Sequence, residues 1–295
     1  MKTPPVCDYE GSDYQTQFWE QSHRDYEDQV EALALRRLLP DEGNLLLEVG
    51  AGAGRNTLRY QGYRQIVLLD YSLTQLQQAQ ARLGREDRYV YVAANVYQLP
   101  FVRGLFDGAT MIRTLHHMAD APAALQEIRR VLQPNSPFLL EFANKQNLKA
   151  IFRYWLNRQD WSPFTPESVE FVELNFDFHP KTIRKWLREA DFEIQRQLTV
   201  SHFRLKILKR LIPTSVLVFL DSMAQHTGNW WQLSPSVFTR SITIGESPLA
   251  RPGEFFLCPK CGNKDLIEKM ESLVCSSCSH TWKIQDGIYD FRDVS

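Results

Sequence analysis

Short apolar runs alternate with amphipathic stretches between residues 24 and 244 of this chain. An apolar run bounded by turn residues is typical of a strand buried in a parallel sheet. Such runs occupy residues 45–49, 66–70, 89–94, 106–112 and 137–142. Apolar side chains recur at helical spacing in residues 24–39, 73–83 and 121–132. This alternation predicts the α/β fold class, with a mostly parallel sheet that is doubly wound by helices.

Two insertions interrupt the alternation in the second half of the chain. A helical pattern returns at residues 180–190, and strand patterns follow at 192–194 and 236–244. The insertions lie at about 144–178 and 201–235 and are rich in aromatic and apolar residues. Insertions at the carboxyl edge of such a sheet usually shape a substrate pocket, and an apolar pocket suits a hydrophobic substrate. Packing of the two insertions against each other as scaffold is the alternative.

A glycine-rich loop follows the first strand. The apolar run contains Glu48 near its end and then breaks into Gly50, Gly52 and Gly54. Alternate glycines let the backbone turn sharply and approach a ligand, because no Cβ stands in the way. Residues 56–60 are expected to open a helix whose N–H groups face that ligand. The G-x-G-x-G spacing differs from the G-x-G-x-x-G of dinucleotide-binding loops, so the loop predicts a different ligand.

A second acid stands at the end of the next strand. Asp70 comes 18 positions after Gly52, close to the position at which nucleotide-binding α/β units carry a ribose-binding carboxylate. An acid that merely leads into a helix is the alternative. However, Ser72 already supplies the N-cap of the next helix, with Gln75 as its capping-box partner. We therefore expect Asp70 to accept hydrogen bonds from both ribose hydroxyls.

Together these motifs resemble class I S-adenosylmethionine-dependent methyltransferases of the type 11-like group. Residues 95–101 are similar to the family's D-A-x-x-L-P-F segment, with Asn95 in place of the acid, and residues 106–117 are similar to its segment ending in L-H-H. The resemblance covers about residues 24–143 and implies a seven-stranded sheet and S-adenosylmethionine as cofactor. The cofactor-binding residues that it implies are Glu48, Gly50, Ala51, Gly52, Gly54, Asp70, Tyr71, Asn95, Val96 and Arg113.

The resemblance also suggests roles for single residues. The family's acid at the position of Asn95 bonds the adenine amino group, and an amide oxygen can accept that bond. A plain turn residue is the alternative. The loop after the fourth strand lies beside the methionine half of the cofactor in the family, so Arg113 is a candidate contact to the cofactor's carboxylate or to substrate. The candidate catalytic residues are His116, His117 and Arg113, and a structural role for the paired histidines is the alternative.

Four of the five cysteines cluster near the C-terminus, after a linker at 245–253 that contains glycine and proline. Two C-x-x-C pairs, Cys258 with Cys261 and Cys275 with Cys278, offer four thiolates for tetrahedral Zn²⁺. So short a segment needs a staple to hold its fold, and four protein ligands make the predicted zinc structural. The residues that follow resemble the tail of small zinc-ribbon proteins that partner RNA and protein methyltransferases, which implies that a protein partner could bind the ribbon.

Composition narrows the classes of function. The 295-residue chain carries a formal net charge of −1, so bulk attraction to nucleic acid is not expected. The sequence begins without an apolar leader, and its longest apolar run is too short to span a bilayer. A cytoplasmic protein is therefore expected.

The sequence predicts two domains. Residues 1–246 would form the methyltransferase domain, with residues 1–44 as an N-terminal cap over the cofactor pocket or simply as a packed helix. Residues 253–295 would form the zinc ribbon. The expected function is methyl transfer from S-adenosylmethionine to a small apolar or lipid-like acceptor. Two alternatives stay open: an RNA methyltransferase that contacts its substrate through the ribbon, which the acidic residues of the ribbon disfavour, and a non-catalytic cofactor-binding adaptor.

Overall fold

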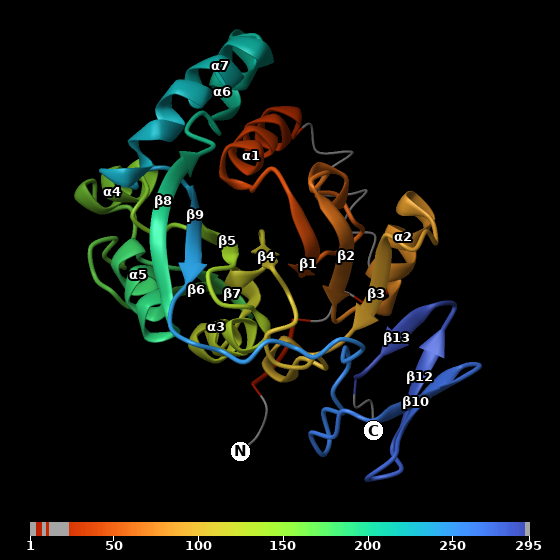
Figure 1. Cartoon of the computed structure of the whole chain (residues 1–295). Coiled ribbons are helices and arrows are strands. Elements are labelled where there is room, and N and C mark those ends of the chain that lie inside the picture. The colour runs from red at the N-terminus through yellow and green to blue at the C-terminus, as the bar shows by residue number, and fades with distance from the viewer. Residues whose placement is uncertain (1–3, 8–9, 12–23, 293–295) are drawn as a thin grey trace.

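The computed structural model describes residues 4–7, 10–11 and 24–292 of the chain (Figure 1). Of the predicted N-terminal cap, residues 1–3, 8–9 and 12–23 lie outside the described part. The last three residues of the predicted ribbon, 293–295, lie outside it as well.

Seven strands form the predicted sheet in the order β3-β2-β1-β4-β5-β9-β8. Their bounds are β1 (Gly43–Val49), β2 (Tyr63–Asp70), β3 (Tyr89–Ala93), β4 (Gly108–Met111), β5 (Pro137–Ala143), β8 (Phe192–Val200) and β9 (Ser236–Thr243). Strands β1 to β5 run parallel to one another, and β9 is antiparallel to both β5 and β8. The prediction of a mostly parallel α/β sheet is confirmed.

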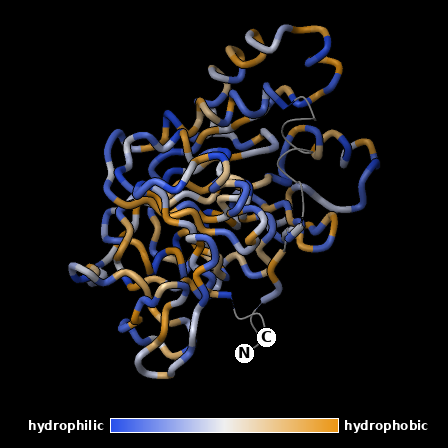
Figure 2. The backbone as a smooth tube through the Cα atoms, turned by 90° about the vertical axis from the view of Figure 1, so that its right-hand side faces the viewer, coloured by the Kyte–Doolittle hydropathy of each residue, from blue (hydrophilic) through white to orange (hydrophobic). Residues whose placement is uncertain are grey.

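Helices cover both faces of this sheet, which confirms the doubly wound arrangement. The four that pack on it are α1 (Asp25–Leu38), α2 (Leu73–Leu83), α3 (Ala121–Val131) and α5 (Pro180–Glu189). Successive strand residues point to opposite faces, so Leu46 joins one apolar cluster with α1 and α2, whereas Leu47 joins another with α3 and α5. Figure 2 shows the hydrophobic segments of the sheet running through the middle of the molecule.

The helix predicted at residues 56–60 is wrong. The chain makes only one short 3-10 turn there, η2 (Thr57–Arg59), before β2 begins at Tyr63. Too few residues separate the glycine loop from β2 for a helix that could span the sheet. Instead α1, which precedes β1, packs in the same apolar cluster as Tyr60 and covers this face.

Both insertions leave the sheet at its carboxyl edge. The first follows β5 and contains α4 (Leu148–Trp155) and the hairpin of β6 (Val169–Val172) and β7 (Asn175–Asp177). The second follows β8 and contains α6 (Lys206–Leu211), α7 (Thr214–Ala224) and the 3-10 turn η5 (Gln225–Asn229). Because β5 and β8 are each antiparallel to β9, they point the same way, so both insertions start from one edge.

The C-terminal segment extends the sheet beyond β3. Its strands β10 (Leu266–Lys269), β11 (Ser272–Cys275), β12 (Thr281–Gln285) and β13 (Ile288–Asp290) form an antiparallel ribbon. β13 then pairs in parallel with β3, so the described residues contain one sheet of eleven strands rather than seven. Phe256 stacks on Phe101 with ring centroids 5.9 Å apart. The division into domains at 246 and 253 stays a prediction.

Within the described residues, the structure contains no helix whose length and apolar character would let it cross a membrane.

Candidate functional site

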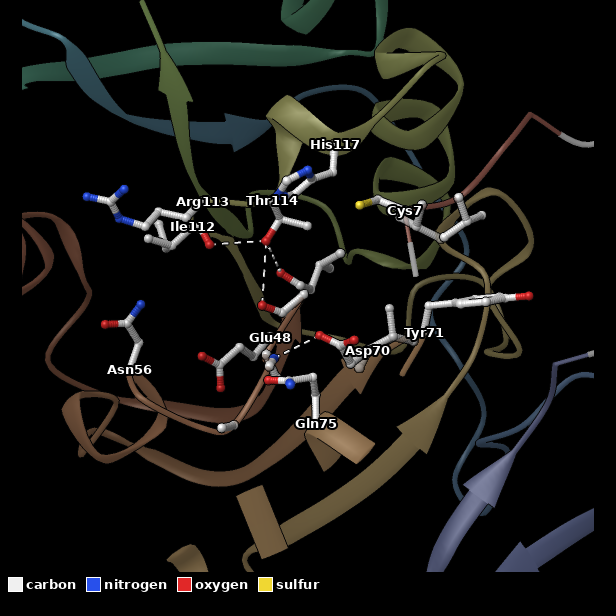
Figure 3. A pocket seen from close by; sticks show the side chains of 18 of the residues that line it. Cys7, Glu48, Asn56, Asp70, Tyr71, Gln75, Ile112, Arg113, Thr114 and His117 are labelled. Atoms are coloured by element: carbon white, nitrogen blue, oxygen red, sulfur yellow. Dashed lines mark hydrogen bonds between the residues drawn. The ribbon is translucent and has the colours of Figure 1, made fainter. Parts of the chain in front are cut away.

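A crevice opens at the carboxyl ends of β1, β2 and β4 (Figure 3). The strand order reverses at β1, because β2 lies on one side of it and β4 on the other, and open α/β sheets bind ligands at such a point. Eight of the predicted cofactor residues line the crevice: Glu48, Gly50, Ala51, Gly52, Asp70, Tyr71, Val96 and Arg113. The sequence motifs therefore converge on one cavity.

The alternate glycines let the loop after β1 pack closely against two neighbours. Gly50 has a φ of 69°, and a Cβ built on it would lie 2.2 Å from Thr114 Oγ1. Gly54 has a φ of 70°, and its Cβ would lie 2.9 Å from Leu83 Cδ1 of α2. Both positions require glycine on conformational and steric grounds. Gly54 is not among the residues that line the crevice; it lets the loop pack against α2 on the side away from the crevice.

Asp70 is held in place by backbone amides. Its Oδ2 accepts a hydrogen bond from Gly52 N at 2.8 Å, and its Oδ1 accepts one from Ser72 N at 3.0 Å. Asp70 thus links the glycine loop to the start of α2 and lines the crevice.

Glu48 lies at the base of the crevice and is buried. Burial raises the pKa of its carboxyl to about 7, although a hydrogen bond from Thr57 Oγ1 at 2.6 Å acts in the opposite direction. The negative charge of Asp70 also raises this pKa, because both carboxylates face the same space. A cationic ligand placed there would favour the ionised form of Glu48.

Asn95 caps the short 3-10 turn η3 (Val96–Gln98). Its Oδ1 accepts a hydrogen bond from Tyr97 N at 3.0 Å, which is the turn role that the sequence left open. Asn95 itself is not among the crevice residues, whereas its neighbours Ala94 and Val96 are. Its predicted bond to an adenine amino group stays a prediction.

Arg113 directs its side chain toward α1. Its Nε donates to Glu31 Oε1 at 2.8 Å, its Nη2 contacts the same oxygen, and Arg55 donates to the other oxygen at 2.9 Å. Burial alone would raise the pKa of Glu31, but the two guanidinium groups hold it at about 2. The predicted contact of Arg113 with a ligand stays a prediction, and in this structure Arg113 anchors α1 beside the crevice.

The paired histidines lie in the 3-10 turn η4 (Leu115–His117) and differ in position. His117 lines the crevice, and its Nδ1 lies 3.1 Å from Leu174 O. Since a carbonyl only accepts, Nδ1 carries the proton and Nε2 is the basic nitrogen. Burial lowers the pKa of His117, so its imidazole is neutral near pH 7. His116 lies outside the crevice, with its ring tilted against that of His117 at a centroid distance of 3.9 Å, and its buried Nδ1 has no hydrogen-bond partner.

Several crevice residues escaped the sequence reasoning. Thr114 donates to Ile112 O at 3.1 Å and packs beneath Gly50, and Cys7 reaches the crevice because Val6 forms a bridge with Met118. Gln75 was identified only as a capping partner, although its position in the first turn after Asp70 was a usable signal. Nothing in the polar N-terminal segment could have pointed to Cys7.

The four clustered cysteines could hold a metal ion. All four Sγ atoms lie within 4.8 Å of one another, with Cys258 and Cys278 at 3.8 Å and Cys261 and Cys275 at 3.4 Å. Tetrahedral Zn²⁺ with Zn–S bonds of about 2.3 Å separates its sulfurs by roughly 3.8 Å. The donor set and spacing therefore fit a four-coordinate ion.

A protein-family model described as a methyltransferase domain matches residues 47–140. Two curated relatives are the O-methyltransferase resE of Aspergillus sclerotiorum and a 2-phytyl-1,4-naphtoquinone methyltransferase of Trichormus variabilis. The first is 38% identical over 105 residues, which cover 34% of this chain and 40% of that protein. The second is 33% identical over 125 residues, which cover 39% of this chain and 55% of that protein. The chain thus spans about half the length of these relatives.

A solved structure agrees with the fold. It is the complex between a Haloferax volcanii methyltransferase activator and a putative methyltransferase, in which one chain is 16% identical to this one with a TM-score of 0.56. The match covers 79% of this chain and 96% of that chain. At this identity the likeness concerns the fold alone.

Proposed function

We propose that this chain, whose residues 47–140 match a methyltransferase-domain model, transfers a methyl group from S-adenosylmethionine to a small apolar acceptor. One observation carries the proposal: Glu48 and Asp70, at the ends of neighbouring strands, line the same crevice on either side of a glycine loop. Asp70 is placed to accept hydrogen bonds from the ribose hydroxyls of such a ligand, and Glu48 is placed near its positively charged part.

The residues of the crevice fit this cofactor. Asp70, fixed by its bonds to Gly52 and Ser72, would accept hydrogen bonds from the ribose hydroxyls. Apolar side chains, including Leu69 and Val96, line the wall on which an adenine ring would lie. Glu48 would balance the positive charge of the methionine half.

When bound, the cofactor would supply a methyl group on a sulfonium, from which a neutral thioether departs as a good leaving group. The work left to the protein is to position the acceptor and exclude water. His117 lies in the crevice with Nε2 as its basic nitrogen and is neutral near pH 7, so it can take a proton from an acceptor hydroxyl or an acidic carbon. We therefore assign the general-base role to His117 rather than to His116.

The lining of the crevice and the names of the relatives support the proposed acceptor class. Val6, Ile112 and Met118 are apolar residues of the crevice. The relatives are named for O-methylation and for methylation of a naphthoquinone. These features support an apolar, ring-containing acceptor that carries a hydroxyl or an activated carbon.

Cofactor binding is tested by calorimetry with S-adenosylmethionine. Asp70→Ala removes two charge-assisted hydrogen bonds and should weaken binding by at least about 100-fold. Asp87→Ala, which alters an exposed acid before β3, should bind like the wild type. Unchanged affinity in Asp70→Ala would refute the site.

Turnover is tested by transfer of a tritiated methyl group to separate pools of small phenols, quinols, lipids and RNA. We expect incorporation in the quinol or lipid pool. His117→Gln should slow this transfer by about 100-fold while cofactor affinity stays within twofold, because a general base contributes to the rate and not to cofactor binding. Incorporation in RNA alone would contradict the acceptor class.

We further propose that the ion held by the four cysteines is structural Zn²⁺. Four thiolates fill a tetrahedral site and leave no position for substrate. Metal analysis of the purified protein should give one zinc per chain, and Cys275→Ser should lose it. Hydrogen exchange in β10 to β12 should then rise, because metal binding in so small a unit supplies its folding energy. Full zinc content in the variant would contradict the assignment.

A further inference from the structure

Helix α7 exposes an apolar stripe to solvent. Its outer face carries Val216, Phe219, Leu220 and Met223, at positions i, i+3, i+4 and i+7 of one helical face. The side chains of Phe219 and Met223 are 64% and 63% exposed. The opposite face is already used, because Leu217 and Asp221 are buried against the domain. In a globular protein such a stripe normally packs against the core, so its exposure indicates an interaction site.

The apolar surface continues over the other insertion. Phe152, Trp155 and Leu156 are exposed on α4 and just after it, and Trp230 and Trp231 are 77% and 69% exposed. The elements are contiguous, since α7 runs directly into η5 and Leu148 N donates to Leu233 O at 2.9 Å. Figure 1 shows α4, α6 and α7 on the same side, and Figure 2 shows hydrophobic segments at the top where α6 and α7 lie.

Basic side chains border this surface. The exposed ones are Lys149, Arg153, Arg158, Lys206 and Arg210. Across residues 147–159 and 205–231, all of them described by the structure, the only carboxylate is Asp221, and it is buried. An apolar face with tryptophans and a basic border is the composition of surfaces that lie in the interface of an anionic bilayer. A second copy packed on the same face would instead bring like charges together.

We propose that α4, α6, α7 and the Trp230–Trp231 pair form an interfacial docking surface for an anionic lipid bilayer. Both insertions start at the carboxyl edge of the sheet, the edge at which the crevice opens. Docking there brings the crevice close to the lipid phase, from which an apolar acceptor is drawn. The acceptor part of this inference rests on the proposed function, whereas the docking part does not.

The test is flotation of the full-length protein with vesicles. Vesicles of phosphatidylcholine and phosphatidylglycerol should carry the protein, and vesicles of phosphatidylcholine alone should carry at least about tenfold less. The variant with Phe219→Ser, Trp230→Ser and Trp231→Ser should partition at least about tenfold less onto the anionic vesicles. The variant with Lys206→Glu and Arg210→Glu should lose binding to the anionic vesicles. Wild-type binding to these vesicles should weaken as salt is added.

The matched control lies on the ribbon. Ile267→Ser with Met270→Ser removes two exposed apolar side chains of the ribbon that are not part of the docking surface. The partitioning of this variant should stay within twofold of wild type. Equal partitioning of wild type and the triple variant would overturn the proposal. A wild-type dimer that the triple variant abolishes would overturn it as well, because a second copy would then cover the face.

The vesicle assay contains no methyl donor, so it separates the two proposals. Vesicle binding without any turnover supports the docking surface and refutes the methyltransferase activity. Turnover on a soluble quinol without vesicle binding refutes the docking surface alone. The triple variant should keep full turnover on the soluble quinol, because none of its changed residues lines the crevice.

Discussion

The two flanks of the crevice are built by different means. On the β2 flank, Asp70 is fixed by backbone amides of Ser72, two positions away, and of Gly52, 18 positions away. On the β4 flank, Arg113 is fixed by Glu31, which lies 82 positions away on α1. The first flank depends on local backbone geometry, whereas the second depends on a buried ion network that spans the chain. Substitutions on one flank should therefore weaken cofactor binding at Asp70, whereas substitutions on the other should weaken the anchoring of α1.

The largest expected effect comes from the ion network. Glu31→Gln keeps the shape of the side chain but leaves the buried guanidinium groups of Arg55 and Arg113 without their shared carboxylate. Breaking a buried pair from one side typically costs several kcal/mol, so we expect the free energy of unfolding to fall by about 3 kcal/mol. Urea denaturation measures this change. Asp25→Asn, at an exposed position of the same helix, should cost less than about 0.5 kcal/mol.

The same pair predicts how stability depends on pH. Because the folded-state pKa of Glu31 is lowered to about 2, its contribution is present above the ordinary carboxyl pKa of about 4.5 and is lost as pH falls toward 2. The difference in stability between wild type and Glu31→Gln should therefore shrink across that window. A difference that stays constant down to pH 2 would show that Glu31 acts by packing alone.

The next effect concerns Glu48, which lies between the flanks. Its pKa of about 7 means that the free protein holds this carboxyl partly protonated near neutrality. A cationic cofactor favours the ionised form, so affinity for S-adenosylmethionine should rise about tenfold between roughly pH 6 and pH 8, with proton release on binding. Calorimetry in buffers of different ionisation enthalpy measures both. Glu48→Gln should abolish the slope, and Glu42→Gln, at an exposed acid, should retain it.

The sequence predicted one flank far better than the other. The strand ends at Glu48 and Asp70, the glycine loop and the Ser72 cap depend on neighbours in the chain, and local patterns specify such features. The ion pair between Glu31 and Arg113 depends on how α1 packs against the sheet, which no local pattern encodes. The wrong helix at residues 56–60 has a related cause, because α1 covers the face that such a helix would have filled.

The ribbon gives a second case of this limit. Two C-x-x-C pairs indicated the metal site, but nothing in the sequence indicated that β13 would pair with β3. That pairing brings the end of the ribbon to the β2 flank of the crevice. The guanidinium of Arg292 makes two hydrogen bonds to Asp290. It also donates from Nη1 to Tyr71 O at 3.1 Å and lies 5.7 Å from the centre of the Tyr71 ring. Tyr71 follows Asp70 and lines the crevice.

The smallest expected effect therefore comes from the ribbon. Arg292→Ala removes a hydrogen bond that fixes the backbone of Tyr71, and S-adenosylmethionine affinity should fall about threefold to fivefold. Calorimetry at pH 8, where Glu48 is ionised, isolates this change from the titration of Glu48. Lys283→Ala, at an exposed position of β12, serves as the matched control and should bind like the wild type. If Arg292→Ala also bound S-adenosylmethionine like the wild type, the ribbon would contribute nothing to cofactor binding. The backbone geometry of the β2 flank would then be sufficient to hold Asp70 and Tyr71.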